Sequence, residues 1–389
     1  MTRGASVLRG VVLWLAGIDL RLTLLAVPPV IPLIHRDLAL NESGIAALSN
    51  LPVLTLAVSS MFGGLLVGRL GVRRAVVAGL CVIAVSSALR GLGPSIAMLF
   101  AMTVVMGAGI AMIQPAFPAL ARAWFGSRVA LGTGIWANGL LCGEALSAAL
   151  TIPLVLPLVG GSWEKSFVVW AAVVAITAVI VAITPHPPDA SDGRTARGTA
   201  WLPDFRDRRV WQLGTFQSAA SLAYFGANTF FPDYLHATGQ AALVAACLTA
   251  LNVGQIPASI AVGLIPMRVL GTRAASWLVA ALIVAALAGV LAFGGAFAVA
   301  GAALLGFSAA YVLTLSFALP ALSAPPAEVP RLAAGTFTLG YSISFVTTLL
   351  SGAAWDATHQ PAIAFLPMLS AAAIVAVLGP RLGRFVARG

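Results

Sequence analysis

The chain has few charged residues: Asp, Glu, Lys and Arg make up 9% of its 389 positions, while 60% of the positions are hydrophobic. A soluble domain carries about 25% charged residues, so this composition excludes an ordinary soluble fold. The only three cysteines, Cys81, Cys142 and Cys247, fall inside apolar runs, where we expect no disulfide. The four histidines are not grouped at ligand spacing, so we expect no metal site and no cofactor.

Motifs for nucleotide-driven or enzymatic chemistry are also lacking. The sequence contains no G-x4-G-K-[ST] motif, and its longest polar loop is too short for a nucleotide-binding domain. No acid pair or nucleophile–base pair lies near one surface, as a membrane enzyme would need, so we expect no enzyme. A channel or sensor without a transport cycle is an alternative, which the internal repeat described below disfavours.

Twelve runs of about 20 apolar residues are present, each long enough to cross a hydrocarbon layer of about 30 Å. They cover residues 11–34, 44–67, 75–93, 96–119, 129–159, 163–184, 209–235, 241–265, 273–293, 296–320, 329–355 and 360–379. The sequence thus predicts an all-α integral membrane protein with twelve transmembrane helices in two six-helix bundles. We expect the bundles to span 1–184 and 209–389, joined by a Pro- and Arg-rich cytoplasmic linker over 185–208.

The basic residues predict the orientation of the chain. With the amino terminus inside, 18 of the 22 Lys and Arg residues fall on the inner side, Arg21 lies within the membrane, and only Arg36, Arg90 and Lys165 fall on the outer side. This asymmetry follows the positive-inside rule and predicts a multi-pass protein of the bacterial inner membrane with both termini cytoplasmic. The net charge of +10 then indicates contact with anionic membrane lipids and no nucleic-acid partner. Nothing in the sequence requires an oligomer, so we expect a monomer.

The two halves repeat each other weakly at a shift of 200 positions. The matching positions are Gly63 and Gly263, Gly71 and Gly271, and Arg73 and Arg273. They follow the second and the eighth run, at equivalent places in the two halves. This placement is what a duplicated parallel repeat predicts.

The loop after the second run also resembles a known family signature. Its spacing is similar to the G-x3-D-R-x-G-x-R-R loop of the major facilitator superfamily and is carried by Gly64, Arg69, Gly71, Arg73 and Arg74. The resemblance implies the twelve-helix fold of that family and a cytoplasmic gating loop at these residues. Gly68 stands where the family has an acidic residue, so a charge latch here would need other partners.

Within that family, the first two runs are similar to the branch of cyanate porters and 2-nitroimidazole exporters. The matching residues are Leu20, Arg21, Leu51, Pro52 and Val53. Asp19 stands where that branch usually has Asn. Since members of the branch differ in cargo and direction, the resemblance implies a transporter without specifying its solute.

Two ionised residues, Asp19 and Arg21, lie near the middle of the first run, and Glu144 lies deep in the fifth. A charge at mid-membrane costs about 2.5–3.5 kcal/mol even on a lenient scale, so all three should face the bundle interior or a hydrated cavity. If the first and fifth helices face a common cavity, as the resemblance implies, Arg21 and Glu144 can meet, and the contact has two interpretations. They form a buried structural ion pair, or Arg21 anchors an anionic solute and Glu144 is its resting counter-ion. The planar guanidinium favours the second, since it binds carboxylate-like groups in bidentate fashion.

Asp19 points away from Arg21, because positions two apart on a helix differ by about 200°. It is a candidate proton carrier, as Glu144 is. The alternative is that Asp19 is a permanent hydrogen-bonding residue in place of the usual Asn. The sequence leaves both hypotheses open.

Uncharged polar residues recur at helical spacing, mainly in the seventh and eighth runs. Together with Arg21 and Glu144, the predicted solute-binding residues are Gln114, Gln217, Tyr224, Asn228, Asn252, Gln255, Tyr311 and Tyr341; Ser221 and Ser344 belong to the same stripes. One polar stripe per helix is typical of a hydrated path. For each residue taken alone, hydrogen bonding between helices is the favoured explanation, whereas the stripes together favour a hydrated path.

Small residues and prolines complete the pattern. Gly139 and Gly143 in the fifth run predict close helix packing, and Pro28 and Pro29 at the outer end of the first run permit bending. The leading hypothesis is a secondary active transporter that moves a small polar or anionic solute across the inner membrane by alternating access, with proton coupling left open. The alternatives are an exporter of nitroheterocycles or drugs by proton antiport and a facilitative uniporter. The fifth run lacks a G-P-x-x-G-G pattern, which disfavours drug antiport.

Overall fold

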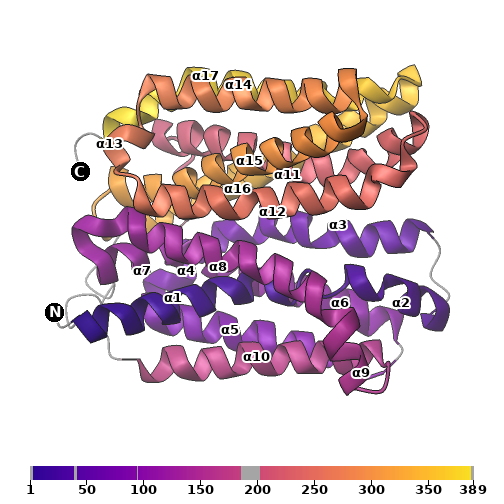
Figure 1. The fold of residues 1–389 in the computed structure, drawn as a ribbon. Coiled ribbons are helices and arrows are strands. Elements are labelled where there is room, and N and C mark those ends of the chain that lie inside the picture. The colour runs from indigo at the N-terminus through magenta and orange to yellow at the C-terminus, as the bar shows by residue number, and fades with distance from the viewer. Residues whose placement is uncertain (1–2, 39–41, 94, 185–201, 387–389) are drawn as a thin grey trace. The chain divides into compact units, whose positions relative to one another are not determined.

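The structure is a computed structural model of the chain, and it describes residues 3–38, 42–93, 95–184 and 202–386. All regular secondary structure in these ranges is helical, which confirms the all-α prediction (Figure 1). The chain divides into two compact units. Unit 1 comprises Met1–Pro203 with Pro326–Ala334, and unit 2 comprises Asp204–Pro325 with Gly335–Gly389. Most of the predicted linker, residues 185–201, lies outside the described residues.

Unit 1 contains the helices of the first six predicted spans. They are α1 (Arg3–Leu22), α2 (Ile31–Leu38), α3 (Glu42–Ser59), α4 (Gly63–Leu70), α5 (Val72–Leu89), α6 (Ile96–Ile113), α7 (Ala116–Phe125), α8 (Val129–Leu150), α9 (Leu156–Leu158) and α10 (Trp163–Ile183). Several spans are broken into two pieces. The fifth is continued past α8 by a π-helical turn over Thr151–Val155, where Pro153 interrupts regular α-helix bonding.

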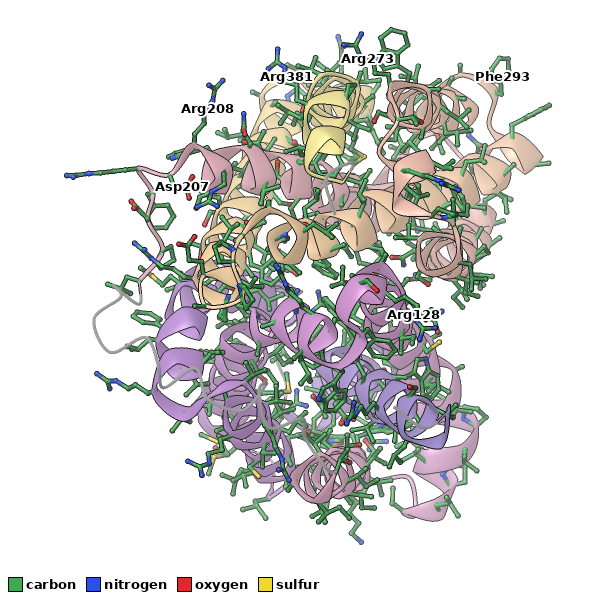
Figure 2. The ribbon with its side chains drawn as sticks, turned by 90° about the vertical axis from the view of Figure 1, so that its left-hand side faces the viewer. Arg128, Asp207, Arg208, Arg273, Phe293 and Arg381 are labelled. Atoms are coloured by element: carbon green, nitrogen blue, oxygen red, sulfur yellow. The ribbon has the colours of Figure 1, made fainter. Side chains whose placement is uncertain are left out.

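Unit 2 contains the helices of the last six predicted spans. They are α11 (Arg208–Ala237), α12 (Val244–Leu264), α13 (Met267–Leu270), α14 (Arg273–Ala288), α15 (Gly295–Ser323), α16 (Val329–Thr358, whose first turn groups with unit 1) and α17 (Leu366–Val386). Figure 2 shows Arg208, Arg273 and Arg381 of this unit extending away from the ribbon. All three belong to the basic set that the sequence places on the inner side.

Nine helical stretches within the described ranges are apolar and long enough to cross a membrane. One of them, Ile96–Ser147, contains the fourth predicted span and most of the fifth. The remaining two predicted spans are α1, which carries charged residues, and α11, which carries a polar stripe. The described helices therefore accommodate all twelve predicted spans.

Short polar side chains begin several of these helices. Ser95 accepts a hydrogen bond from the amide of Met98 at the start of α6, and Ser162 accepts one from Lys165 at the start of α10. Asp207 does the same for the amide of Arg209 at the start of α11. Such caps satisfy amides that have no partner within the helix, which fixes where each span starts.

The two units repeat the same packing pairs. In unit 1, α3 packs on α6 and α5 packs on α10; in unit 2, α12 packs on α15 and α14 packs on α17 (Figure 1). Large aromatic residues fill the interior of unit 1, with the rings of Phe117 and Trp136 5.2 Å apart between α7 and α8. The repeat inferred from a few loop residues therefore extends to the helices.

Candidate functional site

Helices α1 and α8 of unit 1 run in parallel with their backbones in contact. Gly139 and Gly143 of α8 face the carbonyl oxygens of Trp14 and Ile18 so closely that a Cβ atom at either glycine would overlap them. Gly17 of α1 approaches the α8 backbone in the same way. Glycines on both helices permit this contact, as the sequence predicts for the fifth span.

Arg21 and Glu144 meet at this glycine seam. Nε of Arg21 donates to Oε1 of Glu144 at 3.1 Å, and the two side chains are only 4% and 6% exposed. Seven residues earlier on α1, Nε1 of Trp14 donates to Oδ1 of Asn138 at 3.0 Å, so polar contacts join the two helices at two levels. Each charge alone would be costly in the membrane, and the contact neutralises both.

The first span is interrupted directly after Arg21. Helix α1 ends at Leu22, and helical structure resumes with a 3₁₀ turn over Pro28–Val30 and then α2. The expectation of one continuous helix over 11–34 is therefore wrong. Pro28 and Pro29 lack amide hydrogens and disfavour helix in the residue before each of them, which accounts for the break. In transporters, broken helices expose polar backbone groups where ions and solutes bind.

Arg90 is a second buried cation, which the sequence placed in an outer loop. The structure corrects this, since Arg90 is fully buried (0% exposed) at the end of α5. Its Nη2 donates to the carbonyl oxygen of Thr23 at 2.8 Å and to Oγ of Ser87 at 3.1 Å, and its guanidinium carbon lies 4.5 Å from the ring centre of Phe167. A cation at the end of α1 complements the helix dipole there. The one sequence signal for this burial is Ser87, three positions earlier, which supplies an acceptor.

Asp19 is 1% exposed and faces the hydroxyl group of Thr177 on α10. It therefore lies on the opposite side of α1 from the Arg21 and Glu144 pair, as the helical spacing predicts. The structure does not bring the two candidate proton carriers together. Asp19 lies between helices of unit 1, where its hydrogen-bonding and proton-carrying interpretations both remain hypotheses.

The polar stripes of α11 and α12 meet in unit 2. The hydroxyl of Tyr224 donates to Oδ1 of Asn252 at 3.0 Å, and Nε2 of Gln255 donates to the same oxygen at 3.3 Å. Nδ2 of Asn228 donates to the carbonyl oxygen of Tyr224 at 2.9 Å. Tyr224, Asn228 and Asn252 are partly exposed, whereas Gln255 is buried. These four predicted residues thus form one network.

The remaining predicted residues are placed separately. Gln217 is buried against Gly340 of α16, and the ring of the neighbouring Tyr341 lies 6.5 Å from that of Phe225 on α11. The Tyr311 hydroxyl donates to the carbonyl oxygen of Leu270 at 2.9 Å, which ties α15 to α13 rather than joining the network.

Gln114 is buried at the end of α6, where the fourth span bends into α7. Its backbone amide still donates to the carbonyl oxygen of Ile110, so the helical bonding continues up to the bend. The structure brings Arg21 to Glu144 and joins Tyr224, Asn228, Asn252 and Gln255.

Comparison with known proteins gives the family. A sequence profile of the Major Facilitator Superfamily matches residues 12–348, which is most of the chain. The chain belongs to the Major Facilitator Superfamily. As a member of this family, it is a multi-pass membrane transporter of small molecules and not an enzyme.

Relatives of known name share a modest identity with the chain. The uncharacterised transporter YycB of Bacillus subtilis is 23% identical over 372 residues, which cover 94% of this chain and 91% of YycB. The 2-nitroimidazole transporter of Escherichia coli is 24% identical over 367 residues, which cover 94% and 92%. The cyanate transport protein CynX of Escherichia coli is 28% identical over 247 residues, 63% of each chain. The predicted resemblance to the branch of cyanate porters and 2-nitroimidazole exporters is therefore confirmed.

Solved structures show the same fold at low identity. FucP in the outward conformation matches with a TM-score of 0.73 and 14% identity, over 98% of this chain and 99% of FucP. The proton:xylose symporter XylE matches with a TM-score of 0.73 and 11% identity, over 100% and 96%. At these identities the likeness is evidence for the Major Facilitator fold alone.

The loop that carries the superfamily signature joins α4 to α5. Gly71 has φ 79°, a conformation that glycine adopts without strain, and its amide donates to the carbonyl oxygen of Val67 at 2.8 Å. Gly64 is buried in α4, while Arg69 and Arg74 are exposed and Arg73 is partly exposed. The glycine of the signature therefore makes the turn, and the arginines extend from it.

Proposed function

We propose that this transporter moves a small solute with an anionic or anion-like end, and that Arg21 binds that end. The observation that carries the proposal is the buried 3.1 Å contact between Arg21 and Glu144, beside the break in the first span. A guanidinium ion offers two parallel N–H donors, which match two adjacent oxygen atoms of an anion. When no solute is bound, Glu144 forms the ion pair with Arg21 in its place.

The named relatives support this solute chemistry. CynX is named for cyanate, which is an anion, and the other Escherichia coli relative is named for 2-nitroimidazole. A nitro group presents two oxygens in the same plane and spacing as a carboxylate, so it can accept both N–H donors of the guanidinium fork, whereas linear cyanate pairs with the guanidinium through its charge and one terminal atom. We therefore propose small organic or inorganic anions as the leading class of solute for this chain, and nitroheterocycles as the second class.

The binding step also suggests proton coupling. A solute anion that binds the guanidinium brings a second negative charge beside Glu144 in a buried place. Breaking a buried ion pair in this way costs about 3–5 kcal/mol. Proton uptake by Glu144 removes that charge, so anion and proton bind together. This mechanism is a proton-coupled cycle with Glu144 as carrier; Asp19 is the alternative carrier.

The transport cycle that we propose is alternating access by two bundles, residues 1–184 and 209–389, joined by the linker 185–208. The turn at Gly71 and the arginines Arg69, Arg73 and Arg74 take part in closing the cytoplasmic side. The polar residues of unit 2, with the Tyr224 and Asn252 network among them, and Gln114 of unit 1 contact the solute or its water. We place both termini in the cytoplasm of a bacterial cell, with a monomer in the inner membrane.

The test is binding and exchange by the purified protein in detergent and in proteoliposomes. Cyanate, glycolate and 2-nitroimidazole are screened by thermal shift, and positive solutes are tested by counterflow. We expect Arg21→Ala to weaken binding by about 10- to 150-fold, since a hydrogen bond to a charged group contributes about 1.5–3 kcal/mol. Arg21→Lys keeps the positive charge but loses the two parallel N–H donors, so its affinity should lie between those of the wild type and Arg21→Ala.

The matched control is Arg36→Ala. Arg36 is also paired with a carboxylate, Asp37 at 2.8 Å, but its side chain is 70% exposed. This variant should bind as the wild type does. Unchanged affinity in both Arg21 variants would show that Arg21 does not bind the solute.

A further inference from the structure

The last turn of α1, which carries Arg21, lies at the edge of the glycine seam. Gly143 contacts the carbonyl oxygen of Ile18, three residues before Arg21, and α1 itself ends at Leu22. Helical structure resumes only at Pro28. Local opening is easiest next to such a break, where few hydrogen bonds hold the backbone. The orientation of the Arg21 guanidinium therefore depends on the contacts that this turn makes.

Two charged side chains contact this turn from different helices. Glu144 of α8 accepts a hydrogen bond from Nε of Arg21 at 3.1 Å. Arg90, at the end of α5, donates from Nη2 to the carbonyl oxygen of Thr23 at 2.8 Å, two residues after Arg21. In the cycle proposed above the solute displaces Glu144, so the first contact opens. The second contact uses a backbone oxygen and not the Arg21 side chain, so solute binding leaves it intact.

Arg90 is itself held in place by α5 and α10. Its Nη2 also donates to Oγ of Ser87 at 3.1 Å, and its guanidinium carbon lies 4.5 Å from the ring centre of Phe167. Gly91 lies so close to the carbonyl oxygen of Glu164 that a Cβ atom there would overlap it, so the end of α5 packs tightly on the start of α10. Helix α10 contacts both α5 and α1 (Figure 1). A side chain locked at several points can fix the group to which it bonds.

The chain around the break is buried together with Arg90. Leu22, Ala26 and Val27 are at most 5% exposed and belong with Phe167 to one hydrophobic cluster. Arg90 is 0% exposed, and its bonds in the described part of the chain go to uncharged oxygens. A charged donor makes shorter and stronger hydrogen bonds than a neutral one, and a cation complements the dipole at the end of α1. The contact therefore restrains the end of α1 firmly.

We propose that Arg90 is a positioning residue for solute binding. Its bond to Thr23 holds the last turn of α1, so the guanidinium of Arg21 keeps its orientation when the solute displaces Glu144. Arg90 does not contact the solute. The inference rests on the proposed function and adds the residue that keeps the anion-binding group in place. A carboxylate needs two aligned N–H donors and linear cyanate needs one, so orientation affects carboxylates more.

The experiment is a double-mutant cycle on solute binding in detergent, with glycolate, cyanate and 2-nitroimidazole as probes. Arg90→Lys keeps the charge but loses the planar group that bonds to Thr23 and Ser87 together. Ser87→Ala removes a bond that holds Arg90 and keeps the test valid if Arg90→Lys does not fold. Each is measured alone and combined with Arg21→Ala. The matched control is Ser86→Ala, whose buried hydroxyl donates to the carbonyl oxygen of Val82 in its own helix at 2.6 Å.

In the wild-type background, Arg90→Lys should weaken glycolate binding about tenfold and Ser87→Ala about threefold, as the partial loss of a hydrogen bond to a charged group implies. The loss should be smaller for cyanate. In the Arg21→Ala background neither substitution should weaken binding further, because the group that Arg90 positions is gone. Ser86→Ala should bind as the wild type does. All binding is measured well below the lowest melting temperature of the set, so unfolding does not contribute.

The outcomes separate the positioning role from the proposed function. Losses of equal size with and without Arg21 would show that Arg90 only supports the fold, which overturns the inference. Wild-type affinity in both Arg90→Lys and Ser87→Ala, with weakened binding in Arg21→Ala, would overturn it too and leave the proposed function standing. If Arg21→Ala binds every probe as the wild type does, the proposed function fails and the positioning role fails with it.

Discussion

Glu144→Gln tests how the buried ion pair is opened when the solute binds. Glutamine keeps the shape of glutamate and can still accept a hydrogen bond from Arg21, which lies 3.1 Å away in the native pair. It carries no charge and takes up no proton. The substitution thus removes the competitor for the guanidinium and, on our proposal, the proton site as well.

The magnitude follows from linkage between proton and anion. If one proton binds with each anion, the dissociation constant rises about tenfold for each pH unit, because one unit corresponds to about 1.4 kcal/mol. The sign is that binding weakens as pH rises, since protons become scarce. Breaking the buried ion pair without a proton would cost about 3–5 kcal/mol, equivalent to about two to four pH units. In Glu144→Gln, binding should be tight and independent of pH.

The assay is titration of cyanate, or of the tightest solute of the screen, between pH 6 and pH 8. Counterflow and pH-driven accumulation are then measured in proteoliposomes. Glu144→Gln should keep counterflow and lose accumulation. The matched control is Asp19→Asn, which also removes one buried carboxylate but on the α10 side of α1. It should keep the tenfold slope.

Two results would refute this reasoning. A wild-type dissociation constant that does not change with pH would show that no proton accompanies the anion. A slope that persists in Glu144→Gln and disappears in Asp19→Asn would identify Asp19 as the carrier and leave Glu144 as a counter-ion only.

Three further predictions concern stability, measured as melting temperature in detergent. Gly143→Ala should destabilise unit 1 by about 1–3 kcal/mol, because the new Cβ atom would overlap the carbonyl oxygen of Ile18; wild-type stability would refute the tight seam. Arg90→Ala should lower the melting temperature far more than Arg36→Ala, since the first side chain is 0% exposed and the second is 70% exposed; equal losses would contradict the burial of Arg90. The hydrogen bond from Arg36 holds the pKa of Asp37 below its usual value, so the ionised Asp37 side chain stabilises the folded protein above its unfolded-state pKa of about 4. This stabilisation is lost as the pH falls through the lower pKa of the folded state. Asp37→Asn should therefore lower the melting temperature at pH 7 but not at a pH below both pKa values.

Hydropathy and charge predicted the spans well because a membrane imposes a length and a composition on every crossing. The same physics predicted that Arg21 and Glu144 face the interior, since few arrangements allow an isolated charge in hydrocarbon; the sequence left open whether they pair, and the structure shows that they do. The glycines at 139 and 143 predicted the close seam for a similar reason. Each of these inferences depends on a free-energy cost that the residue type carries in the membrane, whichever helices pack against it.

The features that the sequence did not predict depend on tertiary contacts. The break after Leu22 needs the prolines and also a hydrogen-bond donor for a carbonyl oxygen that the helix no longer satisfies. For the carbonyl oxygen of Thr23 that donor is Arg90, 67 positions away in the sequence. The Tyr311 hydroxyl could serve a solute or a backbone carbonyl, and only packing shows that it donates to Leu270.

The two units differ in the charge at equivalent helix contacts: α1 and α8 of unit 1 carry the Arg21 and Glu144 pair, while α11 and α16 of unit 2 carry serines 200 positions later. This difference fits the energetics of a transport cycle. A repeat with an ion pair in both seams would require two buried pairs to open in each turnover, at about 3–5 kcal/mol each. Unit 2 has Ser221 and Ser344 at the positions equivalent to Arg21 and Glu144, so the cycle that we propose needs only one pair to open, with one proton to offset it. Introducing the second pair as Ser221→Arg with Ser344→Glu should therefore slow counterflow strongly in a folded protein. Counterflow at the wild-type rate in that variant would show that opening the pair does not limit turnover.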